Sequence, residues 1–208
     1  MHEKVVIIGA GGHSRVIRDI LGQYDMIDII GYTDLNLRNG MNISYLGDDS
    51  SILEFSPDEI YLANGLGSVS LPKKHKTIYE RFISKGYKFI NIIHRRSILT
   101  QKVKMGEGVQ VMAGAVINTG TIINDNTIIN TSVTIEHECI IGAHSHIATA
   151  ATLCGEVEIG ECCHIGAGAT IIQGVKIGDN TLIGAGALVL SDMPPSSKAF
   201  GVPAKLVK

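Results

Sequence analysis

The feature that most constrains this fold is a hydrophobic repeat with a period of six in the second half of the chain. Every sixth residue from Val111 to Val189 is Ile, Leu or Val, and no break in frame occurs. Two places earlier in each hexad, from Val109 to Ala187, the residue is always small or β-branched. Alternation along a strand puts both positions on one face, and the other positions hold turn residues. Each hexad is therefore a predicted strand and turn, and hexads stack into a solenoid because none buries its aliphatic side chain alone.

The first part of the chain follows a different pattern, in which short apolar runs alternate with helical spacing. Residues 5–8 form an uninterrupted β-branched run next to glycine, which is typical of a strand buried on both faces. Another strand pattern covers residues 28–32, and helical spacing follows Ser14, which we expect to cap the helix. The sequence thus predicts a small parallel α/β domain in residues 1–92 and the solenoid domain in residues 93–208.

Composition and charge exclude several classes of protein. The net charge of −2 and the pI near 6.4 argue against a nucleic-acid binder. No apolar run reaches the roughly 18 residues of a membrane span, and the N-terminal apolar run is too short for a signal peptide. We therefore expect a cytoplasmic protein without membrane insertion. The four cysteines form no CxxC pair, and we interpret them as small core residues.

The hexads resemble those of hexapeptide-repeat acyltransferases, which fold as a left-handed parallel β-helix. In that family three hexads form one triangular coil, so residues 18 apart should stack, and the repeat should give between about four and five coils. The tail Phe200-Gly201-Val202-Pro203-Ala204-Lys205 is similar to the G-x-P-A-K ending common in the family.

A glycine-rich loop follows the first predicted strand. Gly9-Ala10-Gly11-Gly12-His13-Ser14 opens the first helix, where backbone N–H groups and the helix dipole favour an anion such as phosphate. Ser14 stands where the dinucleotide fingerprint G-x-G-x-x-G has its third glycine, so a single nucleotide is favoured over a redox dinucleotide. The alternative is a tight structural turn. Asp34, at the end of the second strand, is placed to bind ribose hydroxyls.

The glycine loop and the hexads together resemble one branch of bacterial sugar acetyltransferases, the sialic acid O-acetyltransferases and UDP-4-amino-sugar N-acetyltransferases. The resemblance implies acetyl-CoA as co-substrate and a homotrimer with CoA between subunits. It also implies that the N-terminal domain holds the UDP part of a sugar nucleotide. The residues assigned to this role are Gly11, Gly12, His13 and Asp34, with Asn64 and Gly65 near the base.

Acetyl transfer to an amine needs a base, and His137 is the best candidate. It lies in Ile135-Glu136-His137-Glu138-Cys139, at a predicted turn with its side chain facing outward. An imidazole suits proton transfer near neutral pH, and the neighbouring Glu138 carboxylate would fix its tautomer. The resembling enzymes have H-E-C at this place, with His as base and Glu as its supporter. The alternative is a solvated turn histidine.

Further residues are assigned to the two substrates. Gly155 lies 18 residues after His137, so its N–H is a candidate oxyanion donor. The resemblance implies that His146 contacts acetyl-CoA near the thioester and that Asn130 lines the acceptor pocket. It also assigns Ala167 and Ala185 to the pantetheine arm. His164 should stack on His146, but no third ligand completes a metal site, so we predict no metal.

These features predict an N-acetyltransferase that moves the acetyl group of acetyl-CoA directly to the amine of a UDP-linked 4-amino-4,6-dideoxy sugar in bacterial glycan biosynthesis. One alternative is a sialic acid O-acetyltransferase, which would use the same base on a hydroxyl. The other is a non-enzymatic β-helix scaffold.

Overall fold

The computed structural model describes residues 2–207, and the chain divides into two compact units. The first runs as far as Gly67 and resumes over Lys74–Ile92. The second consists of Ser68–Lys73 and the chain from Ile93 onward. The segment Ser68–Lys73 therefore belongs with the second unit although it interrupts the first in sequence.

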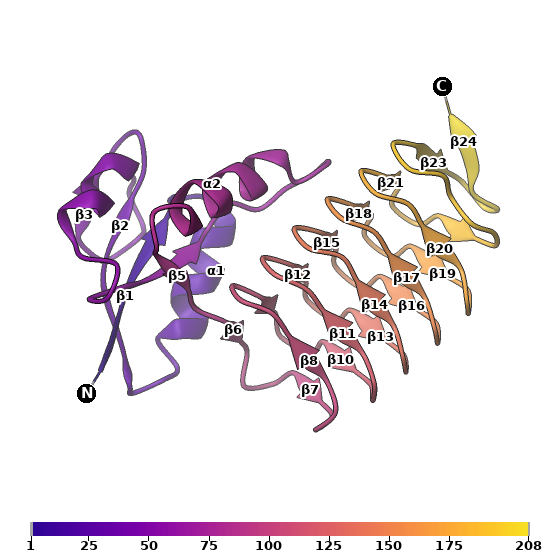
Figure 1. Ribbon diagram of the computed structural model, residues 1–208, viewed down its shortest axis with the longest axis horizontal. Coiled ribbons are helices and arrows are strands. Elements are labelled where there is room, and N and C mark those ends of the chain that lie inside the picture. The colour runs from indigo at the N-terminus through magenta and orange to yellow at the C-terminus, as the bar shows by residue number, and fades with distance from the viewer. Residues whose placement is uncertain (1, 208) are drawn as a thin grey trace. The chain divides into compact units, whose positions relative to one another are not determined.

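The first unit is a five-stranded parallel sheet with the order β3-β2-β1-β4-β5 (Figure 1). Its strands are β1 (Glu3–Ile8), β2 (Ile27–Thr33), β3 (Tyr45–Gly47), β4 (Tyr61–Asn64) and β5 (Lys88–Phe89). Val5, Val6, Ile7 and Ile8 of the central strand β1 are all at most 1% exposed, which explains their unbroken apolar run.

Two α-helices and one 3-10 helix accompany this sheet, namely α1 (Gly12–Leu21), α2 (Lys73–Ile83) and η1 (Asp49–Glu54). The prediction that Ser14 caps α1 is wrong, because the N-cap is Gly11. Ser14 is buried, and its Oγ donates a hydrogen bond of 2.9 Å to the Gly65 carbonyl. The glycines let the chain turn directly from strand into helix, so the helix starts three residues earlier than predicted, and the Ser14 hydroxyl is buried inside the unit.

The second unit is built from very short strands that coil into a solenoid (Figure 1). They are β6 (Ile92–Ile93), β7 (Ile98–Leu99), β8 (Lys104–Met105), β9 (Gln110–Val111), β10 (Val116–Ile117), β11 (Ile122–Ile123), β12 (Ile128–Ile129), β13 (Thr134–Ile135), β14 (Ile140–Ile141), β15 (His146–Ile147), β16 (Thr152–Leu153), β17 (Glu158–Ile159), β18 (His164–Ile165), β19 (Thr170–Ile171), β20 (Lys176–Ile177), β21 (Leu182–Ile183), β22 (Leu188–Val189), β23 (Lys198–Phe200) and β24 (Lys205–Val207).

These strands form three sheets. Sheet I has the order β24-β23-β21-β18-β15-β12-β9-β6, sheet II the order β22-β19-β16-β13-β10-β7, and sheet III the order β20-β17-β14-β11-β8. From β7 to β22, parallel partners are 18 residues apart, as in the pairing of Ile117 with Ile135, so the predicted stacking is confirmed. The predicted fold class, a small parallel α/β domain followed by a left-handed parallel β-helix, is also confirmed.

The repeat residues form the core of the β-helix, but the repeat starts earlier than the sequence analysis recognised. Ile93, Leu99 and Met105 continue the six-residue spacing backwards from Val111 and pack against the same core. The estimate of four to five coils was therefore too small, since sheet II alone has six strands. The early hexads were missed because Met105 interrupts the run of Ile, Leu and Val, and because Asn91 is neither small nor β-branched.

Each turn of the repeat contains one residue with a left-handed backbone. From Gly108 to Gly186, every sixth residue has a positive φ, and the residue is either glycine or one of several others that tolerate the strain. Glu138 is among them, with a φ of 59°. None of the helices within residues 2–207 has the length and apolar character needed to cross a lipid bilayer.

Candidate active site

The glycine loop of the first unit presents open backbone at the start of α1. Gly9 has a φ of 92°, a conformation that favours glycine, and Gly11 is the N-cap of the helix. A Cβ added to Gly11 or Gly12 would meet no atom within 4 Å. Internal packing therefore does not require glycine at these two positions, and the first helical N–H groups are accessible to an anion.

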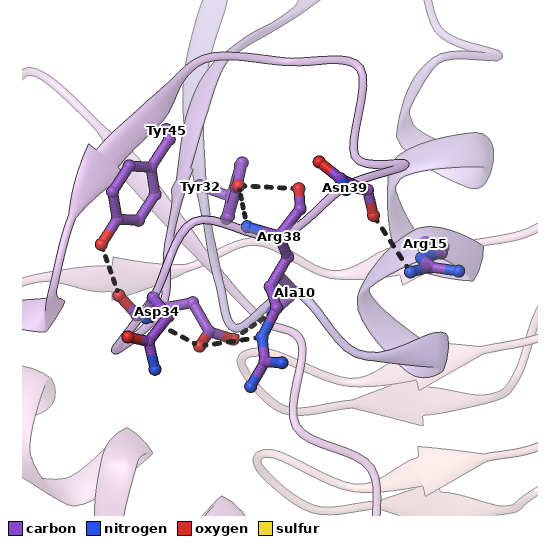
Figure 2. Close-up of polar contacts among 8 residues, drawn as sticks. Ala10, Arg15, Tyr32, Asp34, Arg38, Asn39 and Tyr45 are labelled. Atoms are coloured by element: carbon purple, nitrogen blue, oxygen red, sulfur yellow. Dashed lines mark hydrogen bonds and ion pairs between the residues drawn. The ribbon is translucent and has the colours of Figure 1, made fainter.

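Asp34 lies directly after β2 and ties the glycine loop to the next loop (Figure 2). Its Oδ2 accepts a hydrogen bond of 3.0 Å from the Ala10 N–H. Its Oδ1 accepts one of 3.3 Å from the Asn36 N–H and lies 3.7 Å from Arg38 Nε. The predicted nucleotide residues Gly11, Gly12 and Asp34 thus belong to one connected loop structure, and ribose binding by Asp34 stays a prediction.

The loop after Asp34 is held from both sides (Figure 2). The Tyr32 hydroxyl donates to the Arg38 carbonyl at 3.1 Å and accepts from the Arg38 N–H at 3.0 Å. Tyr45 donates to the Asp34 carbonyl at 3.1 Å, and Arg15 donates to the Asn39 carbonyl at 3.1 Å. The Arg38 guanidinium, with a side chain 57% exposed, therefore stands on a fixed loop beside Asp34. The sequence analysis missed this cation, although it follows Asp34 by four residues.

Asn64 and Gly65 shape the end of β4. Asn64 is 2% exposed, and its Nδ2 donates a hydrogen bond of 2.9 Å to the His75 carbonyl. The Gly65 N–H donates a hydrogen bond of 2.8 Å to the Ile8 carbonyl. A Cβ on Gly65 would lie 2.5 Å from that oxygen, so the position requires glycine. Both residues have structural roles, and their contact with a base stays a prediction. His13 lies in the first turn of α1.

His137 occupies the turn between β13 of sheet II and β14 of sheet III. Its Nδ1 lies 3.3 Å from Glu138 Oε2, and the two side chains are 52% and 64% exposed. Glu138 has the left-handed backbone that recurs in the turns of the repeat. The sequence-predicted base and its predicted supporter are therefore in contact and accessible.

Gly155 lies one coil beyond His137, in the equivalent turn. A Cβ at this position would lie 2.5 Å from both Cε1 and Nε2 of His137, so the imidazole rests against bare backbone. Any larger residue would displace the ring. The role of the Gly155 N–H as an oxyanion donor stays a prediction that this placement suits.

Glu156 joins this group and was missed by the sequence analysis. It follows Glu138 by 18 residues and has the same left-handed φ of 59°. His137, Glu138 and Glu156 each offer one ligand atom, all within 4.8 Å of one another, so this exposed cluster is where a metal ion would be held. The transfer chemistry described below needs none, and the absence of a resident metal stays a prediction.

His146 lies on the outward face of sheet I and is 4% exposed. Its Nδ1 lies 2.9 Å from Ser68 Oγ, and its Nε2 lies 3.1 Å from Asn130 Nδ2. The sequence analysis named His146 and Asn130 but not Ser68, which lies outside the hexads. His146 therefore differs from His137, because both of its ring nitrogens already have partners within the chain.

The other two clustered histidines have structural surroundings. His164 is 7% exposed and packs edge-on against His146, with ring centroids 5.1 Å apart. Its Nδ1 is buried and has no hydrogen-bond partner among the described residues, and burial lowers the pKa of His164 below its ordinary value of 6.5. His144 Nδ1 lies 3.0 Å from Asn126 Nδ2. Neither arrangement suits a general base.

Two sequence families match separate parts of the chain. The PglD N-terminal domain matches residues 4–82, and the bacterial transferase hexapeptide (six repeats) matches residues 156–191. The acetyltransferase domain of PglB from Neisseria gonorrhoeae FA1090, solved in complex with acetyl coenzyme A, is 30% identical over 100% of both chains, with a TM-score of 0.90. The chain belongs to the hexapeptide-repeat sugar acetyltransferases.

Two further solved structures are similar to this chain over almost its whole length. PerB from Caulobacter crescentus, solved with CoA and GDP-perosamine, is 34% identical, and the match covers 98% of this chain and 97% of that one with a TM-score of 0.90. WeeI from Acinetobacter baumannii AYE is 18% identical with a TM-score of 0.83 and shares the fold.

The predicted residues of the acetyltransferase fall into two sets on its β-helix. His137 and Gly155 lie in turns between sheets II and III, whereas Ala167 and Ala185 lie in turns between sheets I and II, and His146 lies on sheet I. In a three-sided coil, the corner between sheets II and III is opposite sheet I. Of the predicted acetyl-CoA residues, Gly155 therefore lies beside the predicted base, whereas His146, Ala167 and Ala185 lie away from it.

The second set lines a hollow of about 420 Å³ on sheet I. Its walls include Ser68, His146, His164, Ala167 and Ala185. A larger hollow of about 560 Å³ lies on sheet III and contains none of the predicted site residues, so size alone does not identify the functional hollow.

Proposed function

We propose that this chain transfers the acetyl group of acetyl-CoA to the amine of a UDP-linked 4-amino-4,6-dideoxy sugar in bacterial glycan biosynthesis. The observation that carries the proposal is the accessible His137–Glu138 pair resting on the Gly155 backbone. The PglB domain binds acetyl-CoA and PerB binds CoA with GDP-perosamine, which supports a donor and an acceptor of these classes.

The reaction needs no covalent enzyme intermediate. The sugar amine attacks the thioester carbonyl, so a C–N bond forms as the C–S bond breaks. His137 Nε2 takes the proton from the amine and returns it to the leaving thiolate of CoA. Glu138 accepts a hydrogen bond from Nδ1–H, which leaves the lone pair on Nε2 and stabilises the imidazolium. The Gly155 N–H stabilises the oxyanion.

The nucleotide would occupy the glycine loop of the first unit. The open backbone at Gly11 and Gly12 admits a diphosphate to the N-terminus of α1, and Arg38 adds a positive charge beside it. Asp34 is the candidate for the ribose. Because PerB binds a GDP-linked sugar, we base the choice of UDP on the resemblance described above.

The catalytic site would require more than one copy of the chain. His137 of one subunit and the acetyl-CoA residues around His146 of its neighbour complete one site if the β-helices close into a homotrimer. The opposite placement of the two sets within one chain supports this arrangement. Light scattering should give the mass of three 22.2 kDa chains, and the mass of a single chain would contradict it. We place the reaction in the cytoplasm, in keeping with four cysteines that form no disulfide with one another.

The proposal is tested by thiol release from acetyl-CoA with a UDP-linked 4-amino sugar, a GDP-linked amino sugar, and free and CMP-linked sialic acid. Fast release with the UDP-linked amine alone is expected. Release only with sialic acids would make the protein an O-acetyltransferase. A protein that binds neither acetyl-CoA nor any nucleotide by calorimetry would be a scaffold.

The nucleotide position has its own test. Gly11→Val adds a side chain where the fold leaves open space, so the protein should fold normally while the diphosphate is obstructed. We expect the KM for the sugar nucleotide to rise roughly tenfold or more and the KM for acetyl-CoA to stay unchanged. An unchanged KM for the sugar nucleotide would remove the glycine loop from the site.

A further inference from the structure

The hydrogen bonds around His146 fix where its proton lies. Asn130 Oδ1 accepts a hydrogen bond of 2.8 Å from the Thr131 N–H, and this bond sets the orientation of the amide. Asn130 Nδ2 therefore faces His146 Nε2, and an amide nitrogen only donates. Because Nε2 must accept, the ring is neutral with its proton on Nδ1. That proton is donated to Ser68 Oγ, which lies 2.9 Å away.

This polarity leaves the hydrogen of the Ser68 hydroxyl available. A hydroxyl has a single hydrogen to donate, and within residues 2–207 no group accepts it from Ser68. Ser68 also lines the hollow of about 420 Å³ on sheet I. The bonds from Asn130 through His146 to Ser68 all run in one direction, which strengthens the last donor in the series. That donor is available to a ligand in the hollow.

We propose that Ser68 is a binding residue for the acyl donor, and that its hydroxyl donates a hydrogen bond to a carbonyl oxygen of the acyl-pantetheine part of acetyl-CoA. This assignment rests on the proposed function. The pantetheine arm offers uncharged carbonyl acceptors, and the hollow offers small residues such as Ala167 and Ala185 with a neutral donor. His146 and Asn130 act as positioning residues, because they set the direction in which Ser68 donates.

The assignment also explains how His146 serves the donor site. The resemblance places His146 near the thioester, yet both of its ring nitrogens have partners inside the chain. His146 therefore acts on the ligand indirectly, through the hydroxyl of Ser68. Ser68 lies 78 residues before His146 in sequence and reaches it because Ser68–Lys73 packs with the β-helix unit.

Calorimetric titration of the full chain with acetyl-CoA and with CoA tests the proposal. Ser68→Ala should weaken acetyl-CoA binding roughly five- to tenfold, the loss expected for one neutral hydrogen bond. Ser68→Thr keeps the hydroxyl and should restore most of the affinity. Ser70→Ala, the same change at an exposed position of the same segment, is the matched control. The KM for acetyl-CoA should follow the affinity while kcat changes less than about twofold.

The two ligands locate the acceptor atom. Loss of affinity for acetyl-CoA alone identifies the thioester carbonyl, and equal loss for CoA identifies a pantetheine amide carbonyl. Unchanged affinity of Ser68→Ala for both ligands would overturn the assignment and leave the proposed function intact. Wild-type protein that binds neither ligand would overturn both. Nitrogen NMR gives an independent check, since a proton on Nε2 of His146 would reverse the polarity and exclude the donor role of Ser68.

Discussion

Two histidines of the same β-helix, His137 and His146, are in opposite situations. His137 lies at an exposed turn with one nitrogen directed to Glu138, and His146 is buried with one nitrogen bonded to Ser68 and the other to Asn130. The His137 imidazole can exchange a proton with a substrate. A proton on Nε2 of His146, in contrast, would point at the N–H of Asn130 Nδ2 and repel it. The partners of its nitrogens, more than the residue type, decide what a histidine can do.

The largest effect should come from removing the exposed imidazole. His137→Ala should lower kcat/KM roughly 100-fold or more, because the attacking amine loses its base. The rate of thiol release measures the loss. Glu161→Ala, a truncation at the equivalent turn position of another corner, is the matched control and should keep full activity. Wild-type turnover by His137→Ala would end the assignment of the base.

Mixing two inactive variants tests whether His137 and the donor hollow on sheet I act across a subunit boundary. His137→Ala removes the base and Ala185→Trp fills the hollow, so each variant should be nearly inactive alone. Co-expressed in equal amounts, they should recover about a quarter of wild-type activity, because one site in four of a random trimer combines the intact His137 of one chain with the intact Ala185 of the next. Activity that stays at the level of the single variants would place both residues in a site made by one chain.

A smaller effect is expected from the carboxylate beside His137. Glu138→Gln should reduce kcat roughly fivefold or less, because the pair is largely exposed and water screens its attraction. The variant keeps the shape of the turn, and a pH–rate profile measured beside wild type reports the support given to the imidazolium. A loss as large as that of His137→Ala would show that the pair is desolvated when substrates bind.

The smallest effect concerns the buried ring that packs on His146. Burial holds the pKa of His164 in the folded chain below its ordinary value of 6.5. At a pH between the folded-state pKa and 6.5, the unfolded chain therefore binds more protons than the folded one. Stability should therefore fall as the pH drops through about 6.5, and His164→Phe should reduce this slope while keeping a ring against His146. Urea midpoints at pH 7.5 and 5.5 measure it. Equal slopes in both proteins would remove His164 as the cause.

The sequence predicted the β-helix, the stacking of Gly155 on His137 and the glycine loop. The six-residue period predicted the β-helix because a stacked coil repeats the same environment every hexad, so burial imposes a strict spacing. The same reasoning placed Gly155 over His137, since residues 18 apart occupy equivalent turns. The glycine loop was recognisable because residues 5–8 lead directly into it. Ser14 was misread because its environment comes from Gly65, far along the chain.

Other parts of the site depend on contacts that no sequence spacing encodes. The candidate roles of Glu156, Arg38 and Ser68 follow from their neighbours in the folded chain. These neighbours are His137, Asp34 and His146, respectively. The early hexads around Leu99 were missed because Met105 stands at the aliphatic position next to Val111, although it packs against the same core.

The sequence by itself determined the two folding patterns and the His137–Glu138 pair, because periodic burial and adjacent residues are local properties. Tertiary structure alone decided that Asp34 binds the Ala10 amide and that Ser68 reaches His146. It also decided that His137 and His146 occupy opposite sides of the coil. These outcomes depend on which hydrogen-bonding groups meet across long separations, and the direction of a hydrogen bond is fixed only when both partners are in place.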